Sequence, residues 1–133
     1  MNMERRSYQF PIVALATQTI SSDTTTVGVA LNLETYKKYK SITFMTIAGV
    51  VTTGDATLLI EDSADGITYA AVADLFLVGL EADTKVDVTS EVKTIGYVGN
   101  KKYVRASLVS ANTASLIATV LAIFENPVEI PVV

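Results

Sequence analysis

The chain has 133 residues, of which 50% are hydrophobic and 18% are charged, and its formal net charge at pH 7 is −4. This length suits one domain whose core needs no covalent staples. Cysteine, histidine and tryptophan are absent, which excludes disulfides, zinc–thiolate sites, cysteine nucleophiles and histidine acid–base chemistry. The negative charge disfavours a dedicated nucleic-acid-binding protein. We therefore expect neither an enzyme nor a cofactor-binding protein.

The N-terminal segment carries Arg5 and Arg6 before a short apolar run, Phe10–Ala16, which Pro11 interrupts. No small-residue cleavage site follows this run, so we expect no signal peptide and synthesis in a cytoplasm. A later apolar stretch, Leu116–Phe124, is far shorter than the ~20 residues that a membrane-spanning helix needs. We therefore expect no membrane partner.

The best helical signal is Asn32–Lys40, where Asn32 suits an N-cap and the lysines suit a helix C-terminus. A helix this short is marginal, so a connector is the preferred interpretation. Elsewhere, strand-like runs alternate with turn residues, and Asp65–Gly66 supplies the positive φ of a tight hairpin turn. The predicted strands are Thr24–Leu31, Ser41–Ala48, Ala56–Glu61, Ile67–Val72, Asp74–Val78, Val92–Val98, Tyr103–Val109 and Ser115–Phe124.

Strands of this length, joined by short turns, predict an all-β protein: a single antiparallel β-sandwich, jelly-roll-like, of about eight strands. We expect one domain over residues 1–133, with residues 1–22 and 125–133 as extended arms. The second arm contains Pro127 and Pro131, which forbid a helix and favour extended backbone. Such an arm packs along its own domain or lies on a neighbouring subunit, and the sequence leaves both possibilities open.

The last predicted strand is apolar on both faces. One face carries Leu116, Ala118, Val120, Ala122 and Phe124, and the other carries Ile117, Leu121 and Ile123. A sandwich strand normally buries one face and exposes the other to water. The second face is therefore covered either by a loop of the same chain or by another protein chain.

Acidic residues are concentrated in the middle of the chain, with nine of the 14 between Asp55 and Glu91. Glu61, Asp62 and Asp65 are close enough in sequence to chelate a hard cation, but their spacing is not that of an EF-hand, so we expect no metal site. Phosphate-binding glycine loops and the Ser-x-x-Lys motif are absent from the sequence. No catalytic constellation is therefore predicted.

Basic residues form three groups: Arg5 with Arg6, Lys37 and Lys38 with Lys40, and Lys101 and Lys102 with Arg105. Groups of this kind are commonly solvated faces. On an acidic protein, they can also mark the side that docks on an oppositely charged surface.

Two stretches of the sequence stand out as a pattern of turns and strands. The first joins Ile47–Thr57 to Ile60–Tyr69, and the second is Lys93–Arg105 with the alanine- and valine-rich strand that ends near Pro127. Together they resemble small virion structural proteins of tailed bacteriophages. The resemblance covers roughly Ser41–Pro127 and implies a capsid-associated or head-decoration protein. In such proteins a tryptophan commonly follows the Ser-x-Asp-Gly turn, and here the corresponding aromatic residue is Tyr69, which weakens a sugar-binding interpretation.

These observations lead to the hypothesis of a non-enzymatic structural protein of a phage virion, made in the host cytoplasm and carried on the capsid surface. It would bridge neighbouring capsid subunits, with the major capsid protein or other virion proteins as partners, and would form a homo-oligomer, for which the resemblance makes a trimer plausible. No nucleic acid and no small-molecule substrate are expected. The predicted interface residues are Tyr8, Phe10, Lys101, Lys102, Arg105, Ile117, Leu121, Ile123, Pro127, Val128, Ile130 and Pro131.

Two alternatives remain open. The first is a carbohydrate-binding or host-adhesion module, which predicts an exposed aromatic patch with Tyr69, Tyr97 or Tyr103. The second is a component of the head–tail junction or of the base of a head spike.

Overall fold

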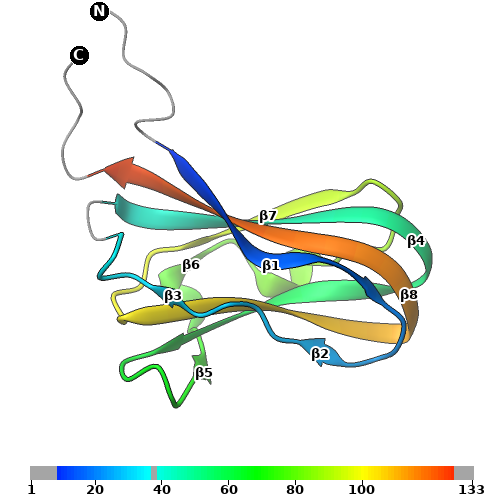
Figure 1. Cartoon of the computed structure of the whole chain (residues 1–133), viewed down its shortest axis with the longest axis horizontal. Coiled ribbons are helices and arrows are strands. Elements are labelled where there is room, and N and C mark those ends of the chain that lie inside the picture. The colour runs from blue at the N-terminus through cyan, green and yellow to red at the C-terminus, as the bar shows by residue number, and fades with distance from the viewer. Residues whose placement is uncertain (1–8, 37–38, 128–133) are drawn as a thin grey trace, which may run out of the picture.

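Two long strands dominate the fold in the computed structural model, which describes residues 9–36 and 39–127 (Figure 1). They are β4 (Tyr39–Ser63) and β8 (Tyr103–Pro127), each of 25 residues. The two strands pair antiparallel along their whole length, from Tyr39 opposite Pro127 to Ser63 opposite Tyr103. Together they form one continuous ribbon that the other strands extend on both sides.

The ribbon bends sharply at its middle, and this bend produces the two layers of a sandwich (Figure 1). The register shifts three times between Ala48 and Asp55. Gly54 has a φ of 72°, and Asn112 and Thr113 on the opposite strand also have positive φ. Left-handed backbone suits glycine and asparagine, so these residues turn the ribbon without ending its pairing. Each long strand therefore contributes to both layers.

One layer is built around the C-terminal half of β8 and the N-terminal half of β4. Its strand order is β1 (Phe10–Ile20), β8, β4, β7 (Val92–Tyr97) and β6 (Leu77–Val78). The other layer contains the remaining halves of β8 and β4. Three two-residue strands extend it: β2 (Thr25–Thr26) and β3 (Leu31–Asn32) pair with β8, and β5 (Ala70–Ala71) pairs with β4.

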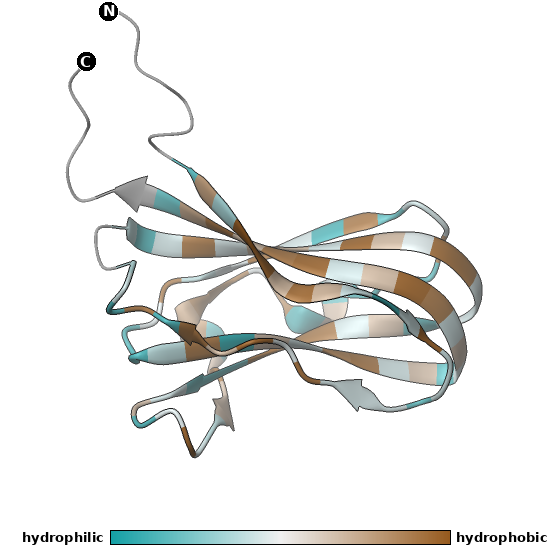
Figure 2. Cartoon of the chain, in the orientation of Figure 1, coloured by the Kyte–Doolittle hydropathy of each residue, from teal (hydrophilic) through white to brown (hydrophobic). Residues whose placement is uncertain are grey.

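The core lies between the two layers and follows strand alternation. Along both long strands, hydrophobic residues recur at every second position and point toward the opposite layer (Figure 2). Phe44, Leu58, Leu108 and Phe124 are almost completely buried in this way. Two short 3₁₀ helices, η2 (Asp74–Phe76) and η3 (Glu81–Thr84), close one side, where η3 contacts β4 and β7. None of the helices in the described ranges is long and apolar enough to cross a membrane.

The prediction of an all-β fold with about eight antiparallel strands is confirmed. Several strand boundaries are wrong. The predicted strands Ser41–Ala48 and Ala56–Glu61 belong to one strand, β4, which bends at Thr52–Asp55 where a turn would separate them. The predicted strands Tyr103–Val109 and Ser115–Phe124 are two halves of β8. A turn signal in a sequence marks a change of chain direction. It does not say whether strand pairing stops there.

The segment Asn32–Lys40 contains turns and no helix in its described part, which agrees with the interpretation as a connector. The Asn32 side chain accepts a hydrogen bond from the Glu34 backbone N–H at 3.0 Å. Predicted strands Thr24–Leu31, Ile67–Val72 and Asp74–Val78 are reduced to two-residue strands. The predicted N-terminal arm is wrong for Phe10–Ile20, which forms β1 and pairs with β8.

Candidate interaction surfaces

The outer side of the β1–β8–β4–β7–β6 layer is the first candidate interaction surface. The strand register lines up outward-facing residues in rows across this layer. One row runs through Pro11, Ile123, Thr43, Gly96 and Val78, and the next through Val13, Leu121, Met45 and Thr94. We call the residues Val13, Met45, Ile47, Val78, Val92, Ile117, Leu121 and Ile123 the outer apolar face.

The outer apolar face is partly exposed to solvent. Val78 is 64% exposed, Val13 53%, Val92 49% and Ile117 37%, while Met45, Leu121 and Ile123 are half-buried by their neighbours. Contiguous exposed apolar patches commonly mark interaction sites of soluble proteins. The outer apolar face is therefore a candidate interface.

Charge is nearly absent from this surface. Within the described rows, Glu125 at one end is the charged residue, and its carboxylate accepts hydrogen bonds from the Thr43 hydroxyl and, at 3.2 Å, from Gln9 Nε2. The remaining polar positions are threonines such as Thr94 and Thr119. A partner that covers this face would lose little hydration of charged groups.

The two interpretations of the last strand can now be compared. Leu116, Val120 and Phe124 point into the core and are at most 2% exposed, as predicted. In its C-terminal half, β8 makes its main contacts with its sheet neighbours β1 and β4. Among the described helices and strands, none lies across Ile117 and Leu121. Ile117 is 37% exposed, so the described residues leave part of this face open to solvent.

The opposite outer side of the sandwich differs in chemistry. Arg105 lies there, where its Nε is 3.1 Å from Glu61 Oε1 and its guanidinium carbon is 4.0 Å from the centre of the Tyr69 ring. Both interactions occupy the guanidinium. Arg105 therefore lies on a different side of the sandwich from Ile117, Leu121 and Ile123, and its place in an interface stays a prediction.

A second candidate surface lies at the end of the sandwich where β1 begins and β8 ends. Four aromatic rings gather there, and the Tyr36 and Phe124 rings stack with centroids 4.3 Å apart. The Phe10 ring lies 5.7 Å from the Tyr36 ring and 6.4 Å from the Tyr39 ring. Phe124 is buried, whereas Phe10 is 41% exposed. The cluster thus continues the core outward to the surface.

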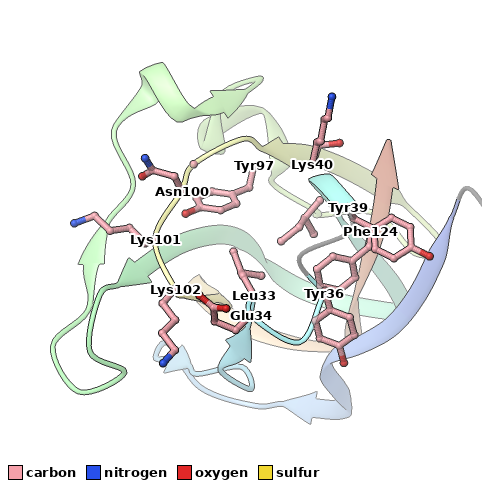
Figure 3. A pocket seen from close by; sticks show the side chains of 13 residues that line it. Leu33, Glu34, Tyr36, Tyr39, Lys40, Tyr97, Asn100, Lys101, Lys102 and Phe124 are labelled. Atoms are coloured by element: carbon pink, nitrogen blue, oxygen red, sulfur yellow. The ribbon is translucent and has the colours of Figure 1, made fainter. Parts of the chain in front are cut away.

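Beside this aromatic cluster lies a cavity of about 250 Å³ between the ends of the two layers (Figure 3). We call it the end cavity. Its walls include the apolar residues Leu33 and Ile42 and the rings of Tyr36, Tyr39, Tyr97 and Phe124. Lys40 lies at the start of β4, and Lys101 and Lys102 lie on the β7–β8 loop. Figure 3 shows their ammonium groups directed outward, around the mouth of the cavity.

Tyr97 holds one wall of the end cavity in place. Its hydroxyl donates a hydrogen bond to Asp62 Oδ2 at 3.0 Å. Burial of the ring, followed by the negative charge and hydrogen bond of Asp62, raises the pKa of Tyr97. The phenol therefore stays protonated and acts as a fixed donor at physiological pH.

The predicted interface residues separate into these two surfaces. Ile117, Leu121 and Ile123 lie on the outer apolar face, whereas Phe10, Lys101 and Lys102 lie at the end of the sandwich. Pro127 pairs with Tyr39 at the same end. Tyr8, Val128, Ile130 and Pro131 lie outside the described residues.

Sequence reasoning missed several members of both surfaces. Met45 and Ile47 had a usable signal, since they alternate with the core residues Phe44 and Thr46. Val13 was missed because its segment was predicted to be an arm. Tyr36 had no signal of its own, since only the tertiary fold brings it beside Phe124.

The three carboxylates considered for a cation do not converge. Glu61 pairs with Arg105 and Asp62 with Tyr97. Asp65 Oδ1 accepts hydrogen bonds from the Ser63 hydroxyl and from the backbone N–H groups of Ile67 and Thr68. These bonds, led by the one from Thr68, lower the pKa of Asp65 to about 2. Within the described ranges, no group of three or more metal-ligating side chains is found.

The tyrosines considered for a sugar platform do not form an exposed patch. Tyr97 is 1% exposed, and the Tyr69 ring lies under Arg105. The Tyr103 ring has Lys102 Nζ 5.5 Å from its centre. A flat exposed aromatic surface, as stacking on a sugar requires, is not built from these three residues.

No protein-family profile matches the sequence, and no curated protein matches it. Among solved structures, the PBSX exported protein XepA is similar with a TM-score of 0.63 at 12% identity, over 93% of this chain and 40% of XepA. A protein of the disulfide-linked pili that form Bacillus endospore appendages is similar with a TM-score of 0.50 at 12% identity, over 90% of this chain and 89% of that protein. This chain thus spans two fifths of the length of XepA. At these identities, the similarity shows a shared fold.

Proposed function

We propose that this protein is a non-enzymatic structural component of a phage particle, carried on the outside of the capsid as a decoration protein. It works by burying surface against its neighbours, and its partners are the major capsid protein or other virion proteins. Synthesis takes place in the host cytoplasm, and assembly follows. The observation that carries this proposal is the outer apolar face, which no described helix or strand covers.

The size of the outer apolar face is consistent with this role. Five strands about 4.8 Å apart, which contribute on average about six residues of 3.3 Å, give a face of about 500 Å². Covering it with a partner would bury about 1,000 Å² in total, which is near the lower limit for a specific interface. One contact of this size is weak, but many copies on a closed shell add their contributions.

Two further observations support the proposal. Over Ser41–Pro127, the sequence resembles small virion structural proteins of tailed bacteriophages. The fold is similar to that of XepA, an exported protein of the phage PBSX. The similarity to an appendage protein fits a surface role as well, although a chain without cysteine cannot form the disulfide links of those pili.

The location is tested on particles made from the genome that encodes the chain. Particles purified on a density gradient are analysed by quantitative mass spectrometry. The proposal expects the chain to be present in many copies, in a fixed ratio to the major capsid protein. One or a few copies per particle would favour the head–tail junction or a spike base, and absence from particles would contradict the proposal.

The outer apolar face is tested by two substitutions on the same strand. Ile117 and Val109 are each 37% exposed, but they lie on opposite outer sides of the sandwich. Ile117→Asp is expected to lower particle binding at least about tenfold, because a carboxylate would be buried against the partner. Val109→Asp is the matched control and should bind as the unchanged protein does.

Leu121→Asp extends this test to the centre of the outer apolar face. Its melting temperature is measured beside particle binding, because Leu121 is half-buried within the sheet. Loss of binding by a folded variant supports the proposal. Equal binding by the Ile117, Leu121 and Val109 variants would show that this face is not the interface.

A further inference from the structure

The end cavity gathers an unusual share of the positive charge of an acidic protein. The described cationic side chains are those of Lys40, Lys85, Lys93, Lys101, Lys102 and Arg105. The two ion pairs found among described residues use Lys93 and Arg105. Lys40, Lys101 and Lys102 stand instead around the mouth of a cavity whose walls combine apolar and aromatic side chains with polar ones. Glu34 is the one carboxylate in the lining, against three lysines. This arrangement suits a ligand that is apolar and negatively charged.

We propose that the end cavity binds residues 128–133 of a second copy of this chain, so that two copies exchange the segments that follow β8. This inference rests on the proposed function, because it supplies the contact by which copies join one another within an assembly. The outer apolar face remains free for the capsid in this arrangement. The two surfaces can therefore be tested separately.

The chemistry of residues 128–133 matches the end cavity. The segment contains Val128, Ile130 and Val132, and its one charged residue is Glu129. Branched apolar side chains suit walls formed by Leu33, Ile42 and Phe124. Glu129 suits the three lysines at the mouth, where opposite charges attract without being fully desolvated.

The size of the cavity favours a short peptide segment. Drug-sized ligands occupy pockets of roughly 300–1,000 Å³, and the end cavity has about 250 Å³. One or two branched side chains fit such a space, as at the anchor points of protein interfaces.

The direction of β8 favours a second copy over the same chain. Phe124 lines the end cavity, and β8 continues for three more residues to Pro127, which pairs with Tyr39. Tyr39 also lines the end cavity, so β8 ends at the edge of the cavity. Pro127 and Pro131 favour extended backbone, which would continue the direction of β8 away from its own domain and toward another copy. Six extended residues span about 20 Å, enough to reach a copy that faces this end.

The test reverses charges on the two sides of the proposed contact in the purified full chain. The mass in solution is measured by sedimentation over about a hundredfold range of protein concentration. We expect the unchanged chain to form an oligomer, and Lys101→Glu with Lys102→Glu to raise its dissociation constant at least about tenfold. Glu129→Lys alone should raise the dissociation constant in the same direction. Combining the three substitutions should restore association to within about threefold of the unchanged chain.

The matched control is Lys85→Glu with Lys93→Glu, which reverses the same number of charges away from the end cavity and should leave association unchanged. Recovery in the combined variant cannot come from a general change in net charge, so it would establish the contact. A chain that stays monomeric at every concentration overturns the inference. So does a combined variant that fails to recover.

Deletion of residues 128–133 tests whether the end cavity binds this segment of its own chain instead of a second copy. If the deletion lowers the melting temperature of a monomer, the segment binds its own chain, and the inference is overturned. Particle binding is measured on the same variants. A chain that binds particles but does not self-associate contradicts the segment exchange alone, whereas a chain absent from particles contradicts the proposed function.

Discussion

The core of this protein is mainly apolar, but it also contains threonine side chains whose hydroxyl groups are buried. Thr46 and Thr84 are both fully buried. The Thr84 hydroxyl accepts a hydrogen bond from the Leu58 backbone N–H at 3.0 Å and donates one to the Glu81 carbonyl. The Thr46 hydroxyl, also in the described core, has no hydrogen-bond partner. An unpaired buried hydroxyl costs free energy that a methyl group of the same shape does not.

Thr46→Val is therefore expected to raise the free energy of unfolding by about 1 kcal/mol. Thr84→Val is the matched control and is expected to lower it by about 1–3 kcal/mol, because it leaves the Leu58 N–H unpaired. Urea unfolding followed by circular dichroism measures both. A Thr46→Val variant less stable than the unchanged protein would show that the hydroxyl has a partner.

Glu81 gives a prediction on pH dependence. Its Oε2 accepts a hydrogen bond from the Ile60 backbone N–H at 2.6 Å, but partial burial, with smaller contributions from Asp74 and Glu61, raises the pKa of Glu81 above its ordinary value. A raised carboxyl pKa means that the folded state favours the protonated form. This contribution to stability is full below the ordinary pKa and is lost as pH rises through the folded-state pKa.

Glu81→Gln keeps an acceptor for the Ile60 N–H and removes the charge. We expect its melting temperature to exceed that of the unchanged protein at pH 7, and the difference to shrink as pH falls toward 4. Glu34→Gln, at an exposed position, is the control. Thermal unfolding at several pH values measures the effect, and a Glu81→Gln variant less stable at pH 7 would contradict it.

At the scale of elements, the bend of the β4–β8 ribbon decides the architecture. Three interactions hold the β8 side of the bend: Asp23 accepts hydrogen bonds from the backbone N–H groups of Thr113 and Ala114, and Asn112 Nδ2 donates one to Asp55 Oδ2 at 2.6 Å. On the β4 side, Gly54 packs so closely that a Cβ there would lie 2.6 Å from the Ala111 carbonyl oxygen. The bend is therefore a specified structure with fixed contacts.

Gly54→Ala is expected to lower the free energy of unfolding by at least about 2 kcal/mol, since it adds left-handed strain to a backbone overlap. For a domain of this size, that is a fall in melting temperature of several degrees. Gly49→Ala is the control in the same bend, because a Cβ there meets Ile117 at an ordinary 3.4 Å. Differential scanning calorimetry compares the two, and equal stability would show that the bend adapts to a side chain.

At the scale of the whole molecule, the two layers share their strands. β4 and β8 pair residues between 40 positions apart, at Ser63 and Tyr103, and 88 positions apart, at Tyr39 and Pro127. The central strand pair of each layer is one half of the β4–β8 ribbon. If this ribbon separates in one layer, the strands that form the other layer are disrupted as well. Pairing of residues so far apart in sequence requires the closure of large loops. The entropy of loop closure is lost before the strand contacts form and stabilise the fold.

We therefore expect one cooperative unfolding transition and refolding on the scale of milliseconds to seconds. Calorimetry should give equal calorimetric and van't Hoff enthalpies for the monomeric protein, measured where self-association is absent. Tyrosine fluorescence and far-ultraviolet circular dichroism should give coincident curves. Two separated transitions would show that the layers unfold independently.

The sequence by itself determined the fold class and the inward faces of the strands. Alternation in segments such as Ser41–Ala48 and Leu116–Phe124 follows from the two-residue period of a strand, which any sheet must obey. It also determined that the last strand has two apolar faces. Local signals of this kind depend only on neighbours in the chain, so they can be read without the tertiary structure.

Only the tertiary structure decided that Thr52–Asp55 is a bend inside a paired strand, that Phe10–Ile20 is an edge strand, and that Arg105 pairs with Glu61. The reason is the same in each case. Pairing between strands more than 40 residues apart is set by which surfaces pack together, and the local sequence carries no record of its partner. The outer apolar face and the end cavity exist because that packing brings distant segments side by side.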